Sequence, residues 1–199
     1  MKPIAVLPAN YQPHHTLDFS TRPMFIRAFD AVLITFILTI ISTLAIVTAF
    51  RPGFSQWVIS NGLTIYGSSI VAISMTLVIG LLLMIWIHEI IYGTCLWLMR
   101  VPTRQIMHRI FFTVQPLGCY IPRTSYLLAR TAPMFLVTFV GITLLLVVPL
   151  ALITTMISLI ILGLAVSAVD LLIISWSLCQ PGNTLVHDDG KYISSFAPR

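Results

Sequence analysis

Long apolar stretches, almost free of charge, decide the environment in which this chain can fold. The stretch "SSIVAISMTLVIGLLLMIWIHEIIYGTCLWLM" covers residues 68–99 and contains Glu89 as its only charged residue. A helix of that length is long enough to cross a lipid bilayer, which takes about 20 residues. Charged residues make up 9% of the whole chain, and apolar residues make up 58%. Soluble domains carry roughly 25% charged residues, so the composition predicts an integral membrane protein surrounded by lipid.

The apolar stretches predict an all-α membrane protein with a four-helix membrane domain over residues 26–178. Between the second and third helices, the sequence "TVQPLGCYIPRTSY" contains two prolines and a glycine. Those residues predict a cytoplasmic loop or hairpin that interrupts the helices. The four predicted transmembrane helices cover residues 26–50, 68–99, 131–149 and 153–178.

The segments outside these helices carry most of the positive charge. Residues 1–25 are rich in proline and predict an irregular N-terminal arm, whereas residues 179–199 predict a short polar C-terminal tail with a β-like segment. Lysine and arginine gather on the cytoplasmic side of membrane proteins. A multi-pass protein with both termini in the cytoplasm satisfies this bias. The basic residues that support this orientation are Lys2, Arg22, Arg27, Arg100, Arg104, Arg109, Arg123 and Arg130.

A histidine followed by a glutamate lies deep in the second predicted helix, in the sequence "IWIHEIIYG". The pattern His-Glu-x-x-His on a helix is typical of zinc proteases. Its two histidines share a helix face and bind the ion, while the glutamate acts as the general base on a bound water. His88 and Glu89 match the pattern, but Tyr92 stands where the second histidine is required. A neutral phenol is a poor zinc ligand at neutral pH, so the metal site is incomplete in its second ligand.

Two other side chains are alternative second ligands. Cys95 lies seven residues after His88 on the same helix face, and His108 lies in the segment that follows the helix. A single cysteine on a membrane helix more often serves packing. An incomplete metal site is therefore expected in preference to one completed by Cys95 or His108.

Asp170 is predicted to lie at the same depth as the His-Glu pair. His88 precedes Met99 by a helical distance of roughly 16 Å, and Asp170 precedes Leu178 by roughly 12 Å. Both helices run toward the cytoplasm in the predicted topology. An ionisable side chain inside a membrane is costly and is a candidate for function. The similar predicted depths of these residues predict a shared site of His88, Glu89 and Asp170. The alternative interpretation is a buried hydrogen bond between His88 and Asp170 that only fixes the packing of the two helices.

Other polar features have simpler interpretations. The sequence His187-Asp188-Asp189 predicts a solvated turn in preference to a weak cation site. The three cysteines lie far apart, which argues against a disulfide framework. No basic run alternates with aromatic residues, so a nucleic-acid partner is not expected.

Four sequence segments follow one another along the chain in the order that one known family shows. They are "HEIIYG", "PLGCYIPRTSYLLARTAP", "AVSAVDLLIISWSL" and "QPGNTLVHDDGKYISSF". With them the chain resembles, over roughly residues 60–198, a family of integral-membrane proteins described as putative zincin peptidases, which is related to the site-2 intramembrane metalloproteases. The resemblance implies that His88 and Asp170 are zinc ligands and that Glu89 is the catalytic base. Tyr92 and Val169 depart from the family pattern, where a histidine and a glycine are expected. The chain is therefore interpreted as a degenerate member.

Two hypotheses follow. In the favoured one, the protein is a zincin-like membrane protein without catalytic activity or bound cofactor, a pseudoenzyme that serves as a binding or structural subunit beside a membrane-protein partner. In the alternative, it is an active intramembrane zinc metalloprotease whose ligands are His88, Asp170 and either Tyr92 or Cys95. Its substrate would then bind residues 112–125 as an added strand. A transporter or channel subunit is disfavoured, because the sequence shows no inverted repeat.

Overall fold

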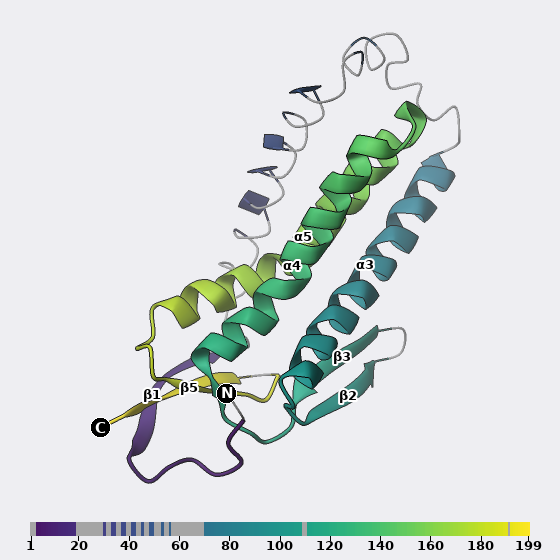
Figure 1. Cartoon of the computed structure of the whole chain (residues 1–199). Helices are drawn as coiled ribbons and strands as arrows, with labels where there is room; N and C mark the ends of the chain where they lie inside the picture. Colours follow the sequence, from purple (N-terminus) through teal and green to yellow (C-terminus); the bar gives the residue numbers. More distant parts are fainter. Residues whose placement is uncertain are drawn as a thin grey trace.

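Three long helices, lying side by side with small sheets at one end, make up most of the described part of the chain (Figure 1). The computed structural model describes residues 3–18, 70–108, 111–190 and 192–199, together with isolated positions between 30 and 56. Helices α4 and α5 run in opposite directions and are joined by a tight turn at Val148 and Pro149. The helices are α3 (Ile70–Leu98), α4 (Arg123–Val147) and α5 (Leu150–Leu178).

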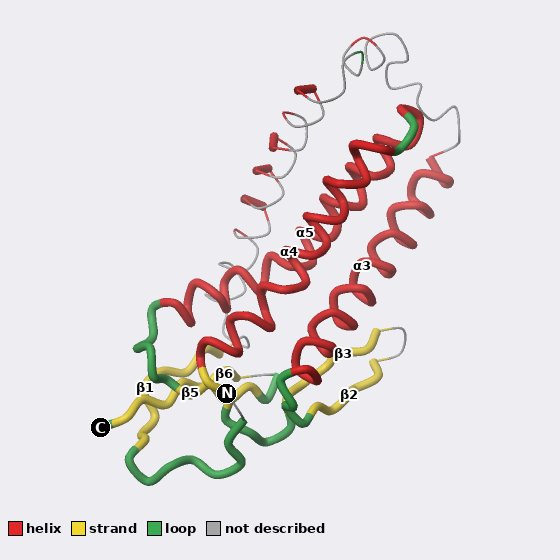
Figure 2. The backbone as a smooth tube through the Cα atoms, in the orientation of Figure 1, coloured by secondary structure: helices red, strands yellow, loops and turns green. Residues whose placement is uncertain are grey.

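Two antiparallel sheets lie together at the lower end of the helices (Figure 2). A two-stranded hairpin follows α3 directly, and it consists of β2 (Thr103–His108) and β3 (Phe111–Pro116). The second sheet combines segments from the two ends of the chain with a short strand that precedes α4. Its strands, in the order β1-β6-β5-β4, are β1 (Tyr11–Asp18), β6 (Tyr192–Pro198), β5 (Leu185–Asp188) and β4 (Ile121–Pro122).

The prediction of an all-α fold with four helices is wrong, because the described residues form three helices and six strands. Apart from isolated positions, the first predicted helix at 26–50 lies outside the described residues. Helix α4 begins at Arg123, whereas the sequence predicted a loop up to residue 130. Pro122 precedes it in an extended conformation with ψ of 136°, and the residues after Pro122 are free of helix breakers until Pro133. The prolines and glycine of that segment end the hairpin; they do not delay the helix.

The predicted irregular arm contains a strand, and the predicted polar tail contains two. Strand β1 pairs with β6 from Tyr11 opposite Pro198 to Asp18 opposite Tyr192, with an irregularity near Pro13. Partners that lie so far apart in the chain leave no local sequence signal, because the pairing depends on tertiary contacts. The pairing also places both ends of the described chain in one sheet.

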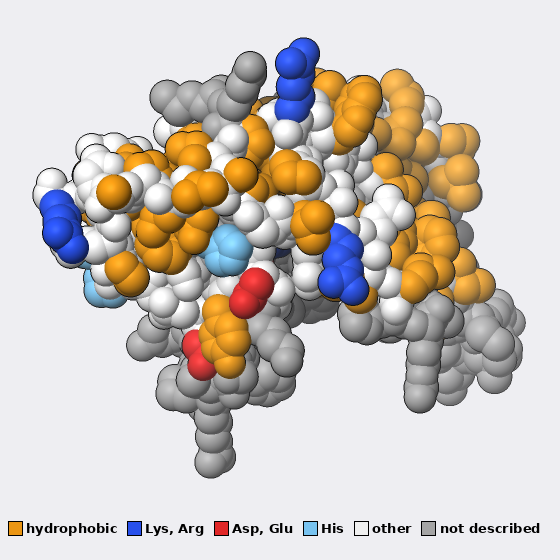
Figure 3. Space-filling view, turned by 90° about the horizontal axis from the view of Figure 1, so that it is seen from below, with side chains coloured by type: hydrophobic (Ala, Val, Ile, Leu, Met, Phe, Trp, Pro, Cys, Tyr) orange, Lys and Arg blue, Asp and Glu red, His pale blue; other side chains and the backbone are white. Residues whose placement is uncertain are grey.

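The helices expose apolar side chains over much of their surface. The segments Val78–Leu98, Arg123–Val147 and Thr155–Leu178 are each long and apolar enough to cross a membrane. Trp97 is 72% exposed, and Phe135 and Phe139 are also exposed. Apolar surface of this extent marks contact with lipid or another protein. These helices indicate a membrane protein. At the sheet end, by contrast, charged side chains and histidines are scattered over the face seen from below (Figure 3).

Small residues allow α4 and α5 to approach closely. A Cβ atom added to Gly141 would lie 2.5 Å from Cγ1 of Ile160, and one added to Gly163 would lie 2.6 Å from Cγ1 of Val137. Each glycine therefore receives a branched side chain from the opposite helix. Such small residues at helix contacts are a common device where both surfaces are apolar.

We predict that Gly141→Ala lowers the stability of the protein. The added methyl group collides with Ile160, and overpacking of this kind costs about 1–3 kcal/mol, which outweighs the gain of about 1 kcal/mol in helix propensity. The measurement is the melting temperature in detergent. Gly182→Ala is the control, because nothing lies within 4 Å of the added atom. In an Ile160→Ala background the cost should shrink; an equal cost in both backgrounds would disprove the proposed collision.

Candidate functional site

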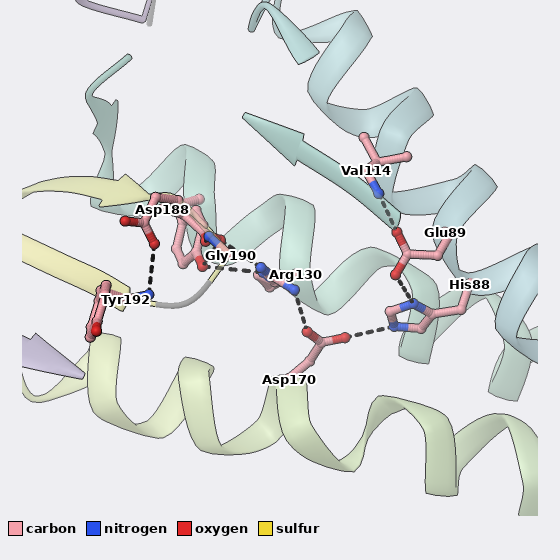
Figure 4. A network of polar contacts seen from close by, with 10 residues as sticks. His88, Glu89, Val114, Arg130, Asp170, Asp188, Gly190 and Tyr192 are labelled. Atoms are coloured by element: carbon pink, nitrogen blue, oxygen red, sulfur yellow. Dashed lines mark hydrogen bonds and ion pairs between the residues drawn. The ribbon is translucent and has the colours of Figure 1, made fainter. Parts of the chain in front are cut away.

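A chain of buried polar side chains connects the three helices to the four-stranded sheet (Figure 4). His88 on α3 and Asp170 on α5 are hydrogen-bonded, with 2.6 Å between Nε2 and Oδ2. The other carboxylate oxygen of Asp170 accepts a hydrogen bond of 2.8 Å from Nη1 of Arg130 on α4. Nη2 of Arg130 donates to Oδ2 of Asp188 on β5 at 2.6 Å. His88, Asp170 and Asp188 are 6%, 4% and 3% exposed, so the network is shielded from solvent.

Two tyrosine rings flank the guanidinium group of Arg130. The carbon Cζ of Arg130 lies 4.4 Å from the ring centroid of Tyr92 and 5.4 Å from that of Tyr126. The hydroxyl of Tyr126 accepts a hydrogen bond of 3.2 Å from Nε of Arg130 and donates one of 2.7 Å to Asp188. The hydroxyl of Tyr92 is buried and has no hydrogen-bond partner among the described residues. Tyr92 therefore contributes the face of its ring, which attracts the cation, and not its oxygen.

Glu89 lies between His88 and the hairpin (Figure 4). Its Oε2 accepts a hydrogen bond of 2.7 Å from the backbone N–H of Val114 on β3. Its Oε1 lies 3.8 Å from Nδ1 of His88. Strand β3 packs closely on α3 at this point, since a Cβ atom added to Gly93 would lie 3.1 Å from Cγ2 of Val114. The carboxylate thus joins the hairpin to the helix.

An open groove of about 680 Å³ lies between α3 and the hairpin, and Glu89 forms part of its wall. The rest of the lining is mainly aromatic and apolar, with Trp86, Trp97 and Phe112 prominent. The groove is therefore reached from outside, whereas His88 and Asp170 are buried behind Glu89. One carboxylate oxygen of Glu89 is already bound to β3.

Each acidic side chain of the network has a basic partner within the protein. Arg130 lies between Asp170 and Asp188, with both ion pairs shorter than 3 Å, and its side chain is 16% exposed. Buried charges are tolerated only when they are paired, and removing one partner of such a pair costs about 3–5 kcal/mol. The loss of any one member of the arrangement is therefore expected to be costly.

Of the predicted site residues, the structure brings His88 and Asp170 into direct contact. Glu89 is adjacent but bonded to β3, and Tyr92 lies against Arg130. Their roles as metal ligands or catalytic base stay predictions. Cys95 packs against the apolar core.

His108 is the last residue of β2, and its side chain lies outside the described part of the structure. Among the described residues, no group of three His, Cys, Asp or Glu side chains is arranged to hold a metal ion.

Three members of the network were not predicted from the sequence. Arg130 was expected in a loop, and Tyr126 was not expected to take part. The interpretation of Asp188 as part of a solvated turn is wrong, because Asp188 is buried and paired with Arg130. A signal was present: Tyr126 and Arg130 are four residues apart, so they share a face once that segment is helical. The pairing of Arg130 with β5 had no local signal.

A comparison with protein families identifies the scaffold. A family model described as putative zincin peptidase matches residues 81–185, which is more than half of the chain. The chain belongs to this zincin peptidase family. The predicted family membership is thereby confirmed. Comparisons with curated proteins and with solved structures found no match.

Zinc is the metal that the zincin family implies, and the donor atoms of this chain do not fit it. Catalytic zinc is held by three protein ligands. Here the imidazole of His88 is bonded to Asp170, both oxygens of Asp170 are engaged, and position 92 is a neutral phenol. The guanidinium of Arg130 lies between Tyr92 and Asp170 and would repel a metal ion there. No catalytic step is assigned to this arrangement.

We predict that Glu89 stabilises the contact between α3 and the hairpin. Glu89→Ala leaves the N–H of Val114 without its acceptor, and losing such a buried partner costs about 1–3 kcal/mol. Glu89→Gln keeps an acceptor oxygen and should cost less. Melting temperature and hydrogen exchange at the Val114 amide measure the effect. If both variants melt like the natural protein and exchange at the natural rate, the structural role is wrong.

Proposed function

We propose that the protein is a membrane-embedded, non-catalytic member of the zincin peptidase family that serves as a binding or structural subunit of a membrane assembly. The observation that carries the proposal is that the predicted ligands are engaged within the chain. His88 binds Asp170 at 2.6 Å, and Asp170 binds Arg130 at 2.8 Å. In this proposal the protein is a degenerate relative of the site-2 intramembrane metalloproteases.

The contacts around the site support a scaffold role. The polar network connects α3, α4, α5 and β5, while Glu89 binds the backbone of β3. Side chains that would perform hydrolysis in an active zincin thus hold elements together here. A rigid junction between apolar helices and sheets suits a subunit that presents a fixed surface to another protein.

The sheet end and the apolar helix faces are the surfaces available to partners. The sheets lie together at the lower end of the helices, with the β2–β3 hairpin alongside the last turns of α3 (Figure 1). Val6 and Leu117 are exposed there, and the outer faces of the helices expose further large apolar side chains. We propose that lipid contacts the helices and that a membrane-protein partner binds the protein. Stable co-purification of that partner in mild detergent is expected.

Metal analysis of the purified protein tests the absence of catalytic zinc. We expect less than stoichiometric zinc in both the natural protein and the His88→Ala variant, because the ligand set is incomplete. A chelator should leave the melting temperature of the natural protein unchanged. One zinc ion per chain that disappears in His88→Ala would instead support the alternative, an active metalloprotease with Asp170 and either Tyr92 or Cys95 as further ligands.

We further propose that the chain crosses the membrane more than once and that both termini face the cytoplasm. The antiparallel pairing of β1 with β6 supports a common side for the two terminal segments, because paired strands cannot lie on opposite sides of a bilayer. The concentration of arginine in residues 100–130 supports the cytoplasm as that side.

Epitope tags at the two termini test this orientation. In intact cells, tags placed before Met1 and after Arg199 should both be protected from an added protease. Permeabilising the plasma membrane should expose both tags together. The positive control is a tag on a protein of known external location. Digestion of only one terminal tag in intact cells would contradict the common side.

A further inference from the structure

The guanidinium group of Arg130 lies at the centre of the candidate site, among the side chains that the family pattern assigns to a metal. We propose that Arg130 replaces the metal ion as the cation of this site, and that positions 92 and 130 together separate this chain from a zinc-binding one. The proposal rests on the proposed function, in which the natural protein holds no catalytic zinc. It goes further, because it names the group that has taken over the role of the ion.

The location of the guanidinium supports the replacement. Its Nη1 lies 2.8 Å from Oδ1 of Asp170, and its central carbon lies 4.4 Å from the ring of Tyr92. Asp170 in turn contacts His88 at 2.6 Å. The guanidinium is therefore enclosed between position 92 and Asp170, where an ion shared by residues 88, 92 and 170 would lie. The two cations exclude each other.

The hydrogen bonds of Arg130 show how one side chain satisfies the site. A guanidinium is planar, permanently charged and carries donors in a fixed fork. Nη1 binds Asp170, Nη2 binds Asp188 and Nε binds the hydroxyl of Tyr126. A zinc ion would bind the imidazole and carboxylate groups directly. Arg130 instead pairs with two carboxylates and connects α5 to β5 through them.

The surroundings of Tyr92 support a role as a neighbour of Arg130 and not as a metal ligand. Tyr92 is 1% exposed, and its hydroxyl has no hydrogen-bond partner within the described structure. Its ring face supports the guanidinium by a cation–π contact. A histidine at this position alone would bring a nitrogen donor next to a cation that still occupies the site. Both positions must therefore change before zinc can bind.

The experiment compares the natural protein with Tyr92→His, Arg130→Met and the double variant. Each purified protein is incubated with zinc, desalted and assayed for bound metal, and its melting temperature is measured with and without zinc. We expect only the double variant to retain about one zinc ion per chain, with an affinity at least about tenfold above that of either single variant. Zinc should raise its melting temperature, and adding His88→Ala should abolish both effects.

A second variant set guards against loss of folding, since Arg130→Met leaves Asp188 without its ion pair. Asp188→Asn added to the double variant removes that unpaired charge and keeps an acceptor for Gly190, whose N–H binds Asp188 at 2.9 Å. Tyr92→Phe tests the role of the ring separately. It should melt at or above the natural temperature, because it removes a buried hydroxyl without a partner.

Several results would overturn the proposal. One such result is tight zinc binding by Tyr92→His alone. A second is a folded double or triple variant that binds no zinc, and a third is marked destabilisation by Tyr92→Phe. Failure of both multiple variants to fold in the presence of zinc would also count against it, because the ion should restore the missing charge. Stoichiometric zinc in the natural protein would refute the proposed function as well. Zinc-free natural protein with unresponsive variants refutes only the role of Arg130.

Discussion

The ion pair between Arg130 and Asp170 is the interaction on which the polar centre of this protein depends. It joins α4 to α5 at 2.8 Å, and each partner extends the connection, Asp170 to His88 and Arg130 to Asp188. Charges this deeply buried persist only when each has a partner. Removing Arg130 would leave Asp188 without its ion pair and Asp170 with His88 as its remaining partner, so this guanidinium is central to the junction between the helices and the sheet.

Within the zincin peptidase family, this chain places the residues of the sequence pattern in contacts between its own elements. His88 and Asp170 remain adjacent, yet they bind each other. Glu89 keeps its place in the sequence pattern, but its carboxylate holds the backbone of Val114. Tyr92 supports Arg130 with its ring. Each of these side chains makes a contact between elements, and these contacts are what support the proposed role as a binding or structural subunit.

The predictions from sequence succeeded for structure that depends on neighbouring residues and failed for contacts between residues far apart in the chain. Helix α3 was expected at residues 68–99 and is found at Ile70–Leu98, because a long apolar run forms its own hydrogen bonds and needs no partner to be recognised. A loop or hairpin between the second and third helices and a β-like segment in the tail were expected, but strand β1 was missed because it pairs with β6 across nearly the whole chain. Asp188 was misread for the same reason, since its partner Arg130 lies on a different element.

The sequence by itself determined the apolar helices, the family and the depth at which His88 and Asp170 could meet, since all three depend on local pattern and spacing. Only the tertiary structure decided what those residues do there. It brought Arg130 from the start of α4 into the space between Tyr92 and Asp170, and it brought Asp188 from the tail to a second ion pair with Arg130. The physical reason is that pairing of buried charges is set by three-dimensional proximity, which spacing along the chain does not encode.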